Sequence, residues 1–226
     1  MDLLISGLEK LGISQNLIEK VLPLLNKYIS ELEEKNQLFD LVGALEHNDV
    51  IIRHILDSLS AWNYIKSQIS EKLKSESCIS LADIGSGAGL PGIPLSIMIN
   101  AEFSDRDIKV FLLERMTKRA DFLDGCIRLL QLNNVQVICE QLERINQESF
   151  DFTVFRAFRP LDKKMTKCLL RVLKHGGIFF AYKAKLEKIT EEMEGVKSQI
   201  PEYKIEKLIV PYLEENERNL VIVERK

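Results

Sequence analysis

The chain of 226 residues has few of the side chains that build metal centres or disulfide frameworks. It contains four cysteines and three histidines, without a C-x-x-C pair and without a histidine near any cysteine. This pattern argues against a zinc site and against a disulfide-stapled fold, and we expect no bound metal. We interpret the cysteines as small buried apolar residues in a reducing cytosol, namely Cys78, Cys126, Cys139 and Cys168.

Long apolar runs and a basic leader are missing as well. No run approaches the roughly 18 apolar residues that a membrane-spanning helix needs. The first residues, Met-Asp-Leu-Leu-Ile-Ser, carry no basic region, so we expect no signal peptide and predict a cytoplasmic protein. With 46% hydrophobic and 29% charged residues, the composition is typical of a globular α/β domain with an extension.

Glycine is concentrated in one place. Residues 80–92 read Ser-Leu-Ala-Asp-Ile-Gly-Ser-Gly-Ala-Gly-Leu-Pro-Gly, so an apolar run ends in Asp83 and four glycines follow, from Gly85 to Gly92. A helical pattern over 93–100 comes next. Strand, glycine-rich turn and helix are typical of a nucleotide-binding crevice, because glycine lets backbone N–H groups approach a ligand. An ordinary tight turn between strand and helix needs only one or two glycines.

The acid before the glycines bears on which nucleotide is bound. Residues 87–92 match G-x-G-x-x-G, the dinucleotide fingerprint, but in that fold the first glycine follows the strand directly. Asp83 would repel a pyrophosphate, whereas it suits a cofactor that carries an ammonium and a sulfonium. Asp-Ile-Gly-Ser-Gly-Ala-Gly resembles motif I of the class I methyltransferases, which bind S-adenosylmethionine.

A second acid follows the next predicted strand. Residues 108–113 read as a strand that ends at Glu114, which lies 25 residues after Gly89. In Rossmann-like units an acid about 20 residues past the glycines accepts hydrogen bonds from the ribose hydroxyls. The alternative is a solvated glutamate that caps the following helix. Its position directly after a strand favours the ribose role for Glu114.

The pattern along the chain predicts two parts: a helical extension over 1–75 and a Rossmann-like domain over 76–226. The extension shows helical patterns at 16–39, where Pro23 predicts a kink or a helix start, and at 48–64, followed by a polar connection over 65–76. The second part alternates strands with helices, which is typical of a parallel sheet. Strands are predicted at 79–84, 108–113, 135–139, 152–156, 177–183, 204–210 and 219–224, and helices at 91–100, 116–131, 160–174 and 186–198.

Positive charge is unevenly distributed. The net charge is −3, yet residues 156–188 contain ten basic and two acidic residues and therefore carry +8. Such a basic face could line the mouth of the crevice and bind phosphates. Arg115, Lys118 and Arg119 would extend it if they point the same way. The alternative is a solvated helix face over 163–174.

Several segments together resemble the RsmG (GidB) family, bacterial methyltransferases that make 7-methylguanosine in 16S ribosomal RNA. They are Ile-Arg-His-Ile-Leu-Asp-Ser over 52–58, the glycine loop over 85–95 with its two prolines, the basic run over 115–122, Arg-Ala-Phe over 156–158 and Tyr-Lys-Ala over 182–184. The resemblance extends from about Ile13 to Glu224. The chain departs from the family pattern at 40–43, Asp-Leu-Val-Gly, and at 141–144, Gln-Leu-Glu-Arg.

The resemblance implies a class I S-adenosylmethionine-dependent methyltransferase fold with an N-terminal helical extension. It implies methyl transfer from S-adenosylmethionine to N7 of a guanine in 16S ribosomal RNA, presented in the small subunit or an assembly intermediate. The open alternatives are an NAD-dependent oxidoreductase and a non-catalytic RNA-binding assembly factor. The predicted cofactor-binding residues are Gly85, Gly87, Leu90, Glu114, Leu142, Glu143 and Arg156.

Guanine N7 has an in-plane lone pair and no proton, so we expect catalysis by proximity and orientation rather than by a general base. Arginine or lysine reads the edge of guanine that carries N7 and O6, and we predict this role for Arg156 and Lys183. His54 either contacts RNA or pairs with Asp57, which could instead pair with Arg53. We predict that Trp62 is a core residue, while Phe158 either stacks on a base or packs internally. The predicted RNA-binding residues are Arg53, His54, Arg115, Lys118, Arg119, Arg159, Lys183 and Lys185.

Overall fold

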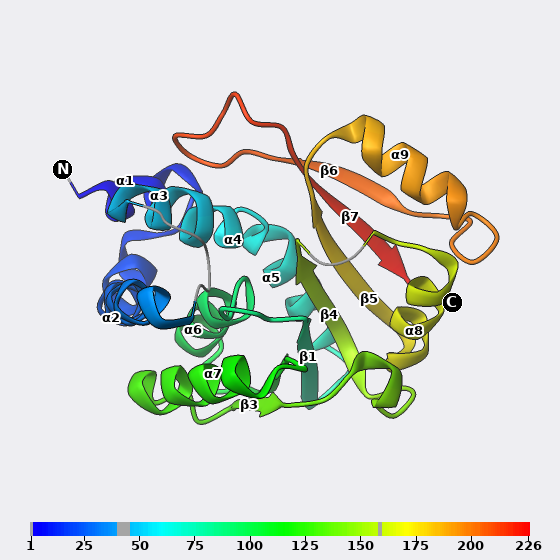
Figure 1. Cartoon of the computed structure of the whole chain (residues 1–226), viewed down its shortest axis with the longest axis horizontal. Helices are drawn as coiled ribbons and strands as arrows, with labels where there is room; N and C mark the ends of the chain where they lie inside the picture. Colours follow the sequence, from blue (N-terminus) through cyan, green and yellow to red (C-terminus); the bar gives the residue numbers. More distant parts are fainter. Residues whose placement is uncertain (1, 40–45, 158–159) are drawn as a thin grey trace.

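The computed structural model describes residues 2–39, 46–157 and 160–226. Within these residues, seven strands form one sheet in the order β3-β2-β1-β4-β5-β7-β6 (Figure 1). The strands from β1 to β5 are parallel, and β7 runs antiparallel to β5 and β6. The strands are β1 (Cys78–Ile84), β2 (Asp107–Leu113), β3 (Val135–Ile138), β4 (Phe150–Arg156), β5 (Leu173–Lys183), β6 (Lys204–Leu208) and β7 (Arg218–Glu224).

Helices cover both faces of the sheet (Figure 1). The first part of the chain forms α1 (Leu3–Lys10), α2 (Gln15–Phe39), α3 (His47–Asp49), the π-helical η1 (Val50–Leu56), α4 (Asp57–Leu59) and α5 (Trp62–Lys72). The remainder forms α6 (Gly92–Glu102), α7 (Thr117–Leu130), the 3-10 helix η2 (Leu142–Arg144), α8 (Lys163–Val172) and α9 (Leu186–Gly195). The predicted α/β fold class is confirmed.

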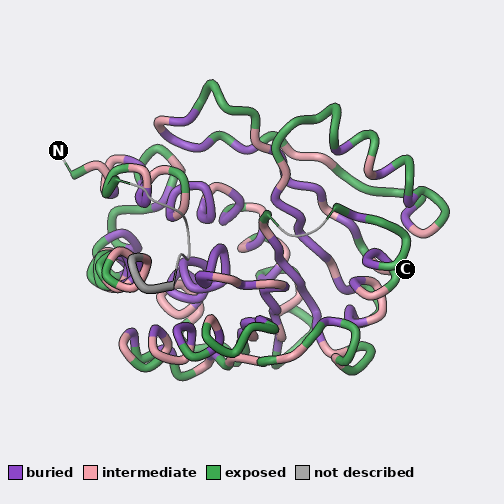
Figure 2. The backbone as a smooth tube through the Cα atoms, in the orientation of Figure 1, coloured by how far each residue is buried: buried purple, intermediate pink, exposed green. Residues whose placement is uncertain are grey.

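Alternating side chains of the strands divide the core into two apolar layers. Leu81 of β1 belongs to one layer, which also contains residues of α1, α2, η1, α6 and α7. Its neighbour Ala82 belongs to the other layer, which is completed by α8 and α9. This alternation follows from the period of two along a strand. Figure 2 shows the central strands mostly buried, whereas the connection between β6 and β7 is exposed over residues 214–217.

Two buried tyrosines connect the N-terminal helices to the carboxyl side of the sheet. Tyr28 of α2 donates a hydrogen bond to the carbonyl of Ala88 in the glycine loop, at 2.7 Å. Tyr182 of β5 donates to the carbonyl of Ser58 in α4, also at 2.7 Å. The N-terminal helices therefore support the loop and the strand end around the predicted site. The boundary between residues 75 and 76 stays a prediction.

The structure differs from the predicted elements in several places. The segment predicted as one helix over 48–64 is π-helical in its centre and breaks before Trp62. The predicted polar connection after it is mostly helix, since α5 continues to Lys72 and buries Ile65 and Ile69. Helix α2 runs through Pro23, so a helix start at that proline is wrong.

Smaller differences concern β5, the cysteines and Trp62. Strand β5 begins at Leu173, where the sequence pattern predicted the end of a helix. Cys78 and Cys139 are exposed, so the prediction that all four cysteines are buried is wrong. Trp62 is 2% exposed and packs edge-on against Phe103, which confirms its predicted place in the core.

Candidate active site

The glycine loop after β1 is built around Asp83. One carboxylate oxygen of Asp83, Oδ2, accepts hydrogen bonds from the Ser86 hydroxyl at 2.7 Å and from the Gly92 N–H at 2.9 Å. A Cβ on Gly92 would lie 2.6 Å from that oxygen, so only glycine lets the start of α6 approach the strand end. Gly85 and Gly87 have φ of +71° and +60°, which favours glycine at both positions.

Asp83 is fully buried, and burial raises its pKa to about 6 even though Ser86 and Gly92 donate to it. Its second oxygen, Oδ1, is buried and has no hydrogen-bond partner among the described residues. A buried acceptor without a hydrogen-bond partner destabilises a folded protein, so such atoms often bind a water molecule or a ligand. The Asp83 carboxylate thus holds the glycine loop and the start of α6 against the end of β1.

Glu114, directly after β2, bridges the glycine loop and the start of α7. It is 5% exposed; one carboxylate oxygen accepts from the Gly87 N–H at 3.0 Å and the other from the Met116 N–H at 2.8 Å. The alternative of a solvated glutamate at this position is wrong. A carboxylate has about four lone-pair sites, so each oxygen of Glu114 keeps one for a further donor such as a ribose hydroxyl.

A first cavity of about 350 Å³ opens beside Glu114, which is within the range of about 300–1,000 Å³ typical of small-molecule sites. Its lining combines backbone of the glycine loop, apolar side chains and two cations that follow β2. These are the features that an adenosine-containing cofactor requires. The lining residues are Ile84, Gly85, Leu113, Glu114, Arg115, Met116, Arg119, Glu140, Gln141, Leu142, Glu143, Ala157 and Met165.

A second cavity of about 430 Å³ shares Ala157 with the first and centres on an ion-pair network. The buried carboxylate of Asp57 accepts from Arg156 Nη1 at 2.8 Å and from Arg218 Nε at 3.3 Å. Arg156 Nη1 also donates to the carbonyl of Arg53 at 3.0 Å. Two guanidinium groups on one carboxylate leave the network with a positive charge, so the cavity suits an electron-rich ligand.

His54 completes this network in its neutral form. Its Nδ1 lies 3.3 Å from Arg156 Nη2, and because a guanidinium only donates, Nδ1 is the acceptor and the proton belongs on Nε2. Burial, followed by the charges of Arg156 and Arg53, lowers the pKa of His54 to about 4. The Nε2 atom is buried without a partner among the described residues, so it is a free donor.

Many of the basic residues between 156 and 188 have internal partners. Lys183 contacts Glu192 of α9 at 2.6 Å, Lys174 contacts Asp151 at 2.8 Å and Lys188 contacts Glu191 at 2.8 Å. Arg171 donates to three backbone carbonyls. Part of the positive charge of this segment is therefore engaged within the protein, and the basic face as a whole stays a prediction. No described residue forms an ion pair with Lys163, Lys164, Lys167 or Lys185.

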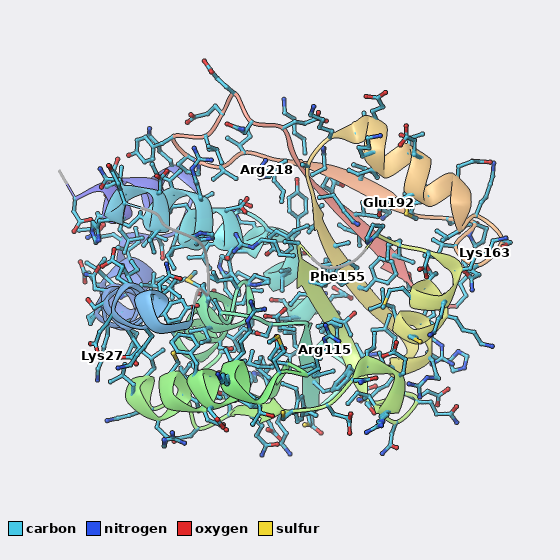
Figure 3. The ribbon with its side chains drawn as sticks, viewed as in Figure 1. Lys27, Arg115, Phe155, Lys163, Glu192 and Arg218 are labelled. Carbon is cyan, nitrogen blue, oxygen red and sulfur yellow. The ribbon has the colours of Figure 1, made fainter. Side chains whose placement is uncertain are left out.

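The unpaired cations lie in more than one place. Figure 3 shows Arg115 near the middle of the molecule, close to α7, whereas Lys163 lies at the edge beyond α8. Lys118 is exposed on the first turn of α7, and Arg119 lines the first cavity. Lys185 is exposed at the start of α9. The cations after β2 are thus the ones that flank the first cavity.

The structure brings most of the predicted site residues to this edge of the sheet. The second cavity is lined by Arg53, His54, Arg156 and Lys183. Arg156, which was predicted to bind the cofactor, is not in the lining of the first cavity. Gly87 and Leu90 lie in the loop beside the first cavity rather than in its lining. The predicted residue Arg159, together with Phe158, lies outside the described residues.

Sequence reasoning missed the centre of the second cavity. The alternative in which Asp57 pairs with Arg53 or His54 is wrong, because Arg53 pairs with Asp49 at 2.8 Å and Asp57 binds Arg156 and Arg218. These partners come from strands that are distant in the sequence, so helical spacing carries no signal of them. An acid that falls on the buried side of a helix, as Asp57 does, was the one available hint.

The sheet order with its antiparallel β7, the glycine loop after β1 and the acid after β2 define a class I, S-adenosylmethionine-dependent methyltransferase fold. A solved S-adenosylmethionine-dependent methyltransferase from Aquifex aeolicus has this fold, with a TM-score of 0.50 and 17% identity over 70% of this chain and 89% of that chain. A tRNA methyltransferase from the same organism gives 0.53 and 12% identity over 72% and 68%.

The chain belongs to the GidB family, rRNA small subunit methyltransferase G, whose model matches residues 21–221. Ribosomal RNA small subunit methyltransferase G of Treponema denticola is 39% identical over 99% of this chain and 94% of that protein. The protein of the same name from Caldicellulosiruptor bescii is 30% identical over 100% of this chain and 92% of that protein. The family resemblance predicted from the sequence is confirmed.

Two further observations concern what the described residues do not contain. No described helix combines the length and the apolar character that crossing a bilayer requires. Nowhere in residues 2–39, 46–157 and 160–226 do three or more histidine, cysteine, aspartate or glutamate side chains gather in a way that would hold a metal ion.

Proposed function

We propose that this chain transfers the methyl group of S-adenosylmethionine to N7 of a guanine in 16S ribosomal RNA, in the cytoplasm where that RNA is made. The observation that supports this most is the pair of adjoining cavities that share Ala157. The first offers the glycine loop and Glu114, and the second offers a positively charged network around Arg156. Transfer between two bound ligands requires that arrangement.

The residues of the first cavity fit the cofactor. Glu114 lines this cavity and keeps acceptor capacity for the ribose hydroxyls, while Asp83 supports the glycine loop from beneath through Ser86 and Gly92. Gly85, Gly87 and Leu90 would border the methionine end. Leu142 and Glu143 would lie at the adenine edge, where Leu142 is 6% exposed and belongs to the apolar layer with α8. The bound cofactor would supply an electrophilic methyl carbon on its sulfonium.

The residues of the second cavity would orient the guanine. Because N7 is the nucleophile, its lone pair must stay free, so the donors of Arg156 and Lys183 should contact O6 rather than O6 and N7 together. Arg156 is held by Asp57 and the Arg53 carbonyl, which fixes the direction of its remaining N–H groups. Catalysis then consists of holding N7 in line with the methyl carbon, which can supply several kcal/mol.

The flanking cations would bind the RNA backbone. Arg115, Arg119 and Lys118 follow β2 and have no ion-pair partner among the described residues, so their charge is available for phosphates. Arg53, His54, Lys183 and Lys185 would contribute from the second cavity and the start of α9. The base must be exposed in a loop of the RNA, because the major groove of A-form RNA is too narrow for side chains.

The experiment that tests the function combines transfer and mapping. The purified chain is incubated with S-adenosylmethionine labelled in its methyl group and with small subunits, assembly intermediates or free 16S RNA. We expect one 7-methylguanosine per RNA molecule in at least one of these substrates. RNA binding without label transfer would instead identify a non-catalytic factor, and binding of NAD in place of S-adenosylmethionine would reject the assignment.

A further inference from the structure

The guanidinium of Arg171, in the last turn of α8, is directed at three carbonyl groups rather than at a carboxylate. Its Nη1 donates to the carbonyl of Ile145 at 2.6 Å, and its Nη2 donates to the carbonyls of Leu142 and Glu143, each at 3.1 Å. Across the described residues Arg171 makes no ion pair. A single side chain thus contacts nearly every residue of one short segment.

That segment forms one edge of the first cavity. Gln141, Leu142 and Glu143 line the cavity, and the 3-10 helix η2 spans Leu142–Arg144. A helix of three residues leaves nearly all of its carbonyl groups without intrahelical partners. Within η2 the backbone supplies only the bonds from Arg144 to Gln141 and from Ile145 to Leu142. Arg171 supplies donors for the carbonyls of Glu143 and Ile145 and a second donor for the carbonyl of Leu142.

Helix α8 therefore contacts the cavity in two ways. Its first turn, capped by Asp162, places Met165 in the lining, and its last turn carries Arg171 to η2. Hydrogen bonds from a charged donor are stronger than those between neutral groups, and the planar guanidinium can satisfy several acceptors at once. The edge of the cavity is consequently attached to a helix whose apolar face packs in the core, although the edge itself is polar and short.

We propose that Arg171 is a positioning residue for cofactor binding: it holds residues 142–145 in the shape that receives the adenine before the cofactor arrives. This inference rests on the proposed function, because it takes the first cavity as the adenosine site. It also removes Arg171 from the candidates for phosphate contact. The charge of Arg171 is used to order a backbone segment.

The test compares Arg171→Met with Lys167→Met. Both variants remove one positive charge from α8, but Lys167 is exposed and has no ion-pair partner among the residues described. Calorimetric titration should show a rise of roughly tenfold or more in the Kd of Arg171→Met for S-adenosylmethionine. The Kd for 5′-methylthioadenosine, which lacks the amino-acid part, should rise by the same factor. Lys167→Met should bind both ligands as the parent chain does.

Three further measurements separate positioning from other roles. Hydrogen exchange without ligand should be faster at the amides of residues 144 and 145 in Arg171→Met and unchanged in Lys167→Met. The KM for S-adenosylmethionine should rise while kcat at saturation stays unchanged, and the Kd for RNA should also stay unchanged. If Arg171→Met does not fold, Arg171→Lys replaces it. The rise in the same constants should then be smaller, because lysine keeps the charge, but it should not vanish, because lysine lacks the planar fork that holds the three carbonyls.

The contrary results are distinct. Unchanged cofactor affinity with weaker RNA binding would overturn the proposal and return Arg171 to the RNA surface. A rise in Kd for S-adenosylmethionine without a rise for 5′-methylthioadenosine would also overturn it, because the effect would then lie at the methionine end. Failure of the parent chain to bind S-adenosylmethionine at all would instead reject the proposed function.

Discussion

Strand β4 carries an ion pair with a buried aspartate at each of its ends, and the two pairs differ in whether they line a cavity. At the amino end, Asp151 accepts from Lys174 at 2.8 Å and from the N–H and hydroxyl of Ser80 at 2.9 and 2.7 Å. At the carboxyl end, Arg156 binds Asp57 at 2.8 Å and contacts His54. Only the carboxyl-end pair lines one of the two cavities that share Ala157.

The two ends of β4 differ in whether the buried polar atoms around them all have hydrogen-bond partners. The carboxylate of Asp151 has three close donors, and although burial opposes it, their hydrogen bonds lower its pKa below the usual value. At the carboxyl ends of the strands, the Asp83 Oδ1 and the His54 Nε2 are buried without partners among the described residues. A completed network stabilises the fold, whereas an incomplete one beside a cavity is available to a ligand. Open α/β sheets bind ligands at the carboxyl ends of their strands, and this molecule follows that rule.

The largest effect we expect comes from removing one cation at each end of β4. Arg156→Met should lower kcat/KM for methyl transfer by about 100-fold or more, since the donor that orients the guanine is lost. Lys174→Met should leave transfer per folded molecule unchanged and lower only the stability. That loss should be modest, because the side chain of Lys174 is 42% exposed. Single-turnover transfer and urea unfolding measure the two quantities.

A second substitution separates orientation from stability at the carboxyl end. Arg156→Met leaves Asp57 buried with Arg218 alone, which is destabilising in its own right. The double variant Asp57→Asn with Arg156→Met also removes the buried carboxylate, which has then lost one of its two partners, so stability should partly recover while transfer should not. Recovery of transfer in the double variant would show that the pair is structural, as we infer for Lys174 and Asp151.

The pH dependence of stability should have opposite signs for the two buried aspartates. Burial raises the pKa of Asp83 from 3.8 to about 6, so native Asp83 takes up a proton before the unfolded chain does. The unfolding free energy of the parent relative to Asp83→Asn should therefore rise, by up to about 3 kcal/mol, as the pH falls from about 7 to 4. Urea unfolding at several pH values measures this difference.

Asp151 supplies the opposing case. Its pKa is lowered in the native protein, so its stabilisation is present above the ordinary value of 3.8 and is lost as the pH falls below it. The parent chain should lose stability relative to Asp151→Asn over that acidic range. Equal slopes for the two variants would mean that the environments of the two carboxylates do not differ as their contacts indicate.

The local pattern of the sequence predicted the fold well because the fold depends on local signals. The predicted strands at 79–84 and 108–113 match β1 and β2 within one residue, and each ends directly before a loop of the site. Alternation and glycine position are sufficient for such elements. The segment at 48–64 was misread because its helical pattern does not distinguish α-helix from the π-helical turn and break that tertiary contacts impose.

The contacts around the first cavity were largely predictable, whereas the pairing inside the second was not, although four predicted site residues line it. The Glu114 carboxylate accepts from the Gly87 N–H, and the places of both residues follow from the order strand, turn and helix. The partners of Asp57 lie 99 and 161 residues away, at the ends of β4 and β7. Pairing over such separations is decided by sheet topology and not by residue spacing. The same reason applies to Arg171, whose three carbonyl partners lie 26 to 29 residues away and leave no trace in the local charge pattern.

The smallest effect we expect concerns single exposed cations at the two ends of β2. Lys118 follows the carboxyl end of β2 on the first turn of α7, and Lys109 lies near the amino end of the strand. Both are exposed, and neither forms an ion pair with any described residue. If RNA docks on the carboxyl side of the sheet, only Lys118 releases a counterion from the phosphates on binding.

Lys118→Gln should therefore reduce the slope of log K for RNA against log salt by about one, with an affinity loss of severalfold at most. Lys109→Gln carries the same charge change and should leave slope and affinity unaltered. Filter binding over a range of potassium chloride concentrations resolves a difference of this size. Equal changes in both variants would mean that the RNA responds to net charge alone, and the contrast between the two ends of the sheet would then not extend to RNA binding.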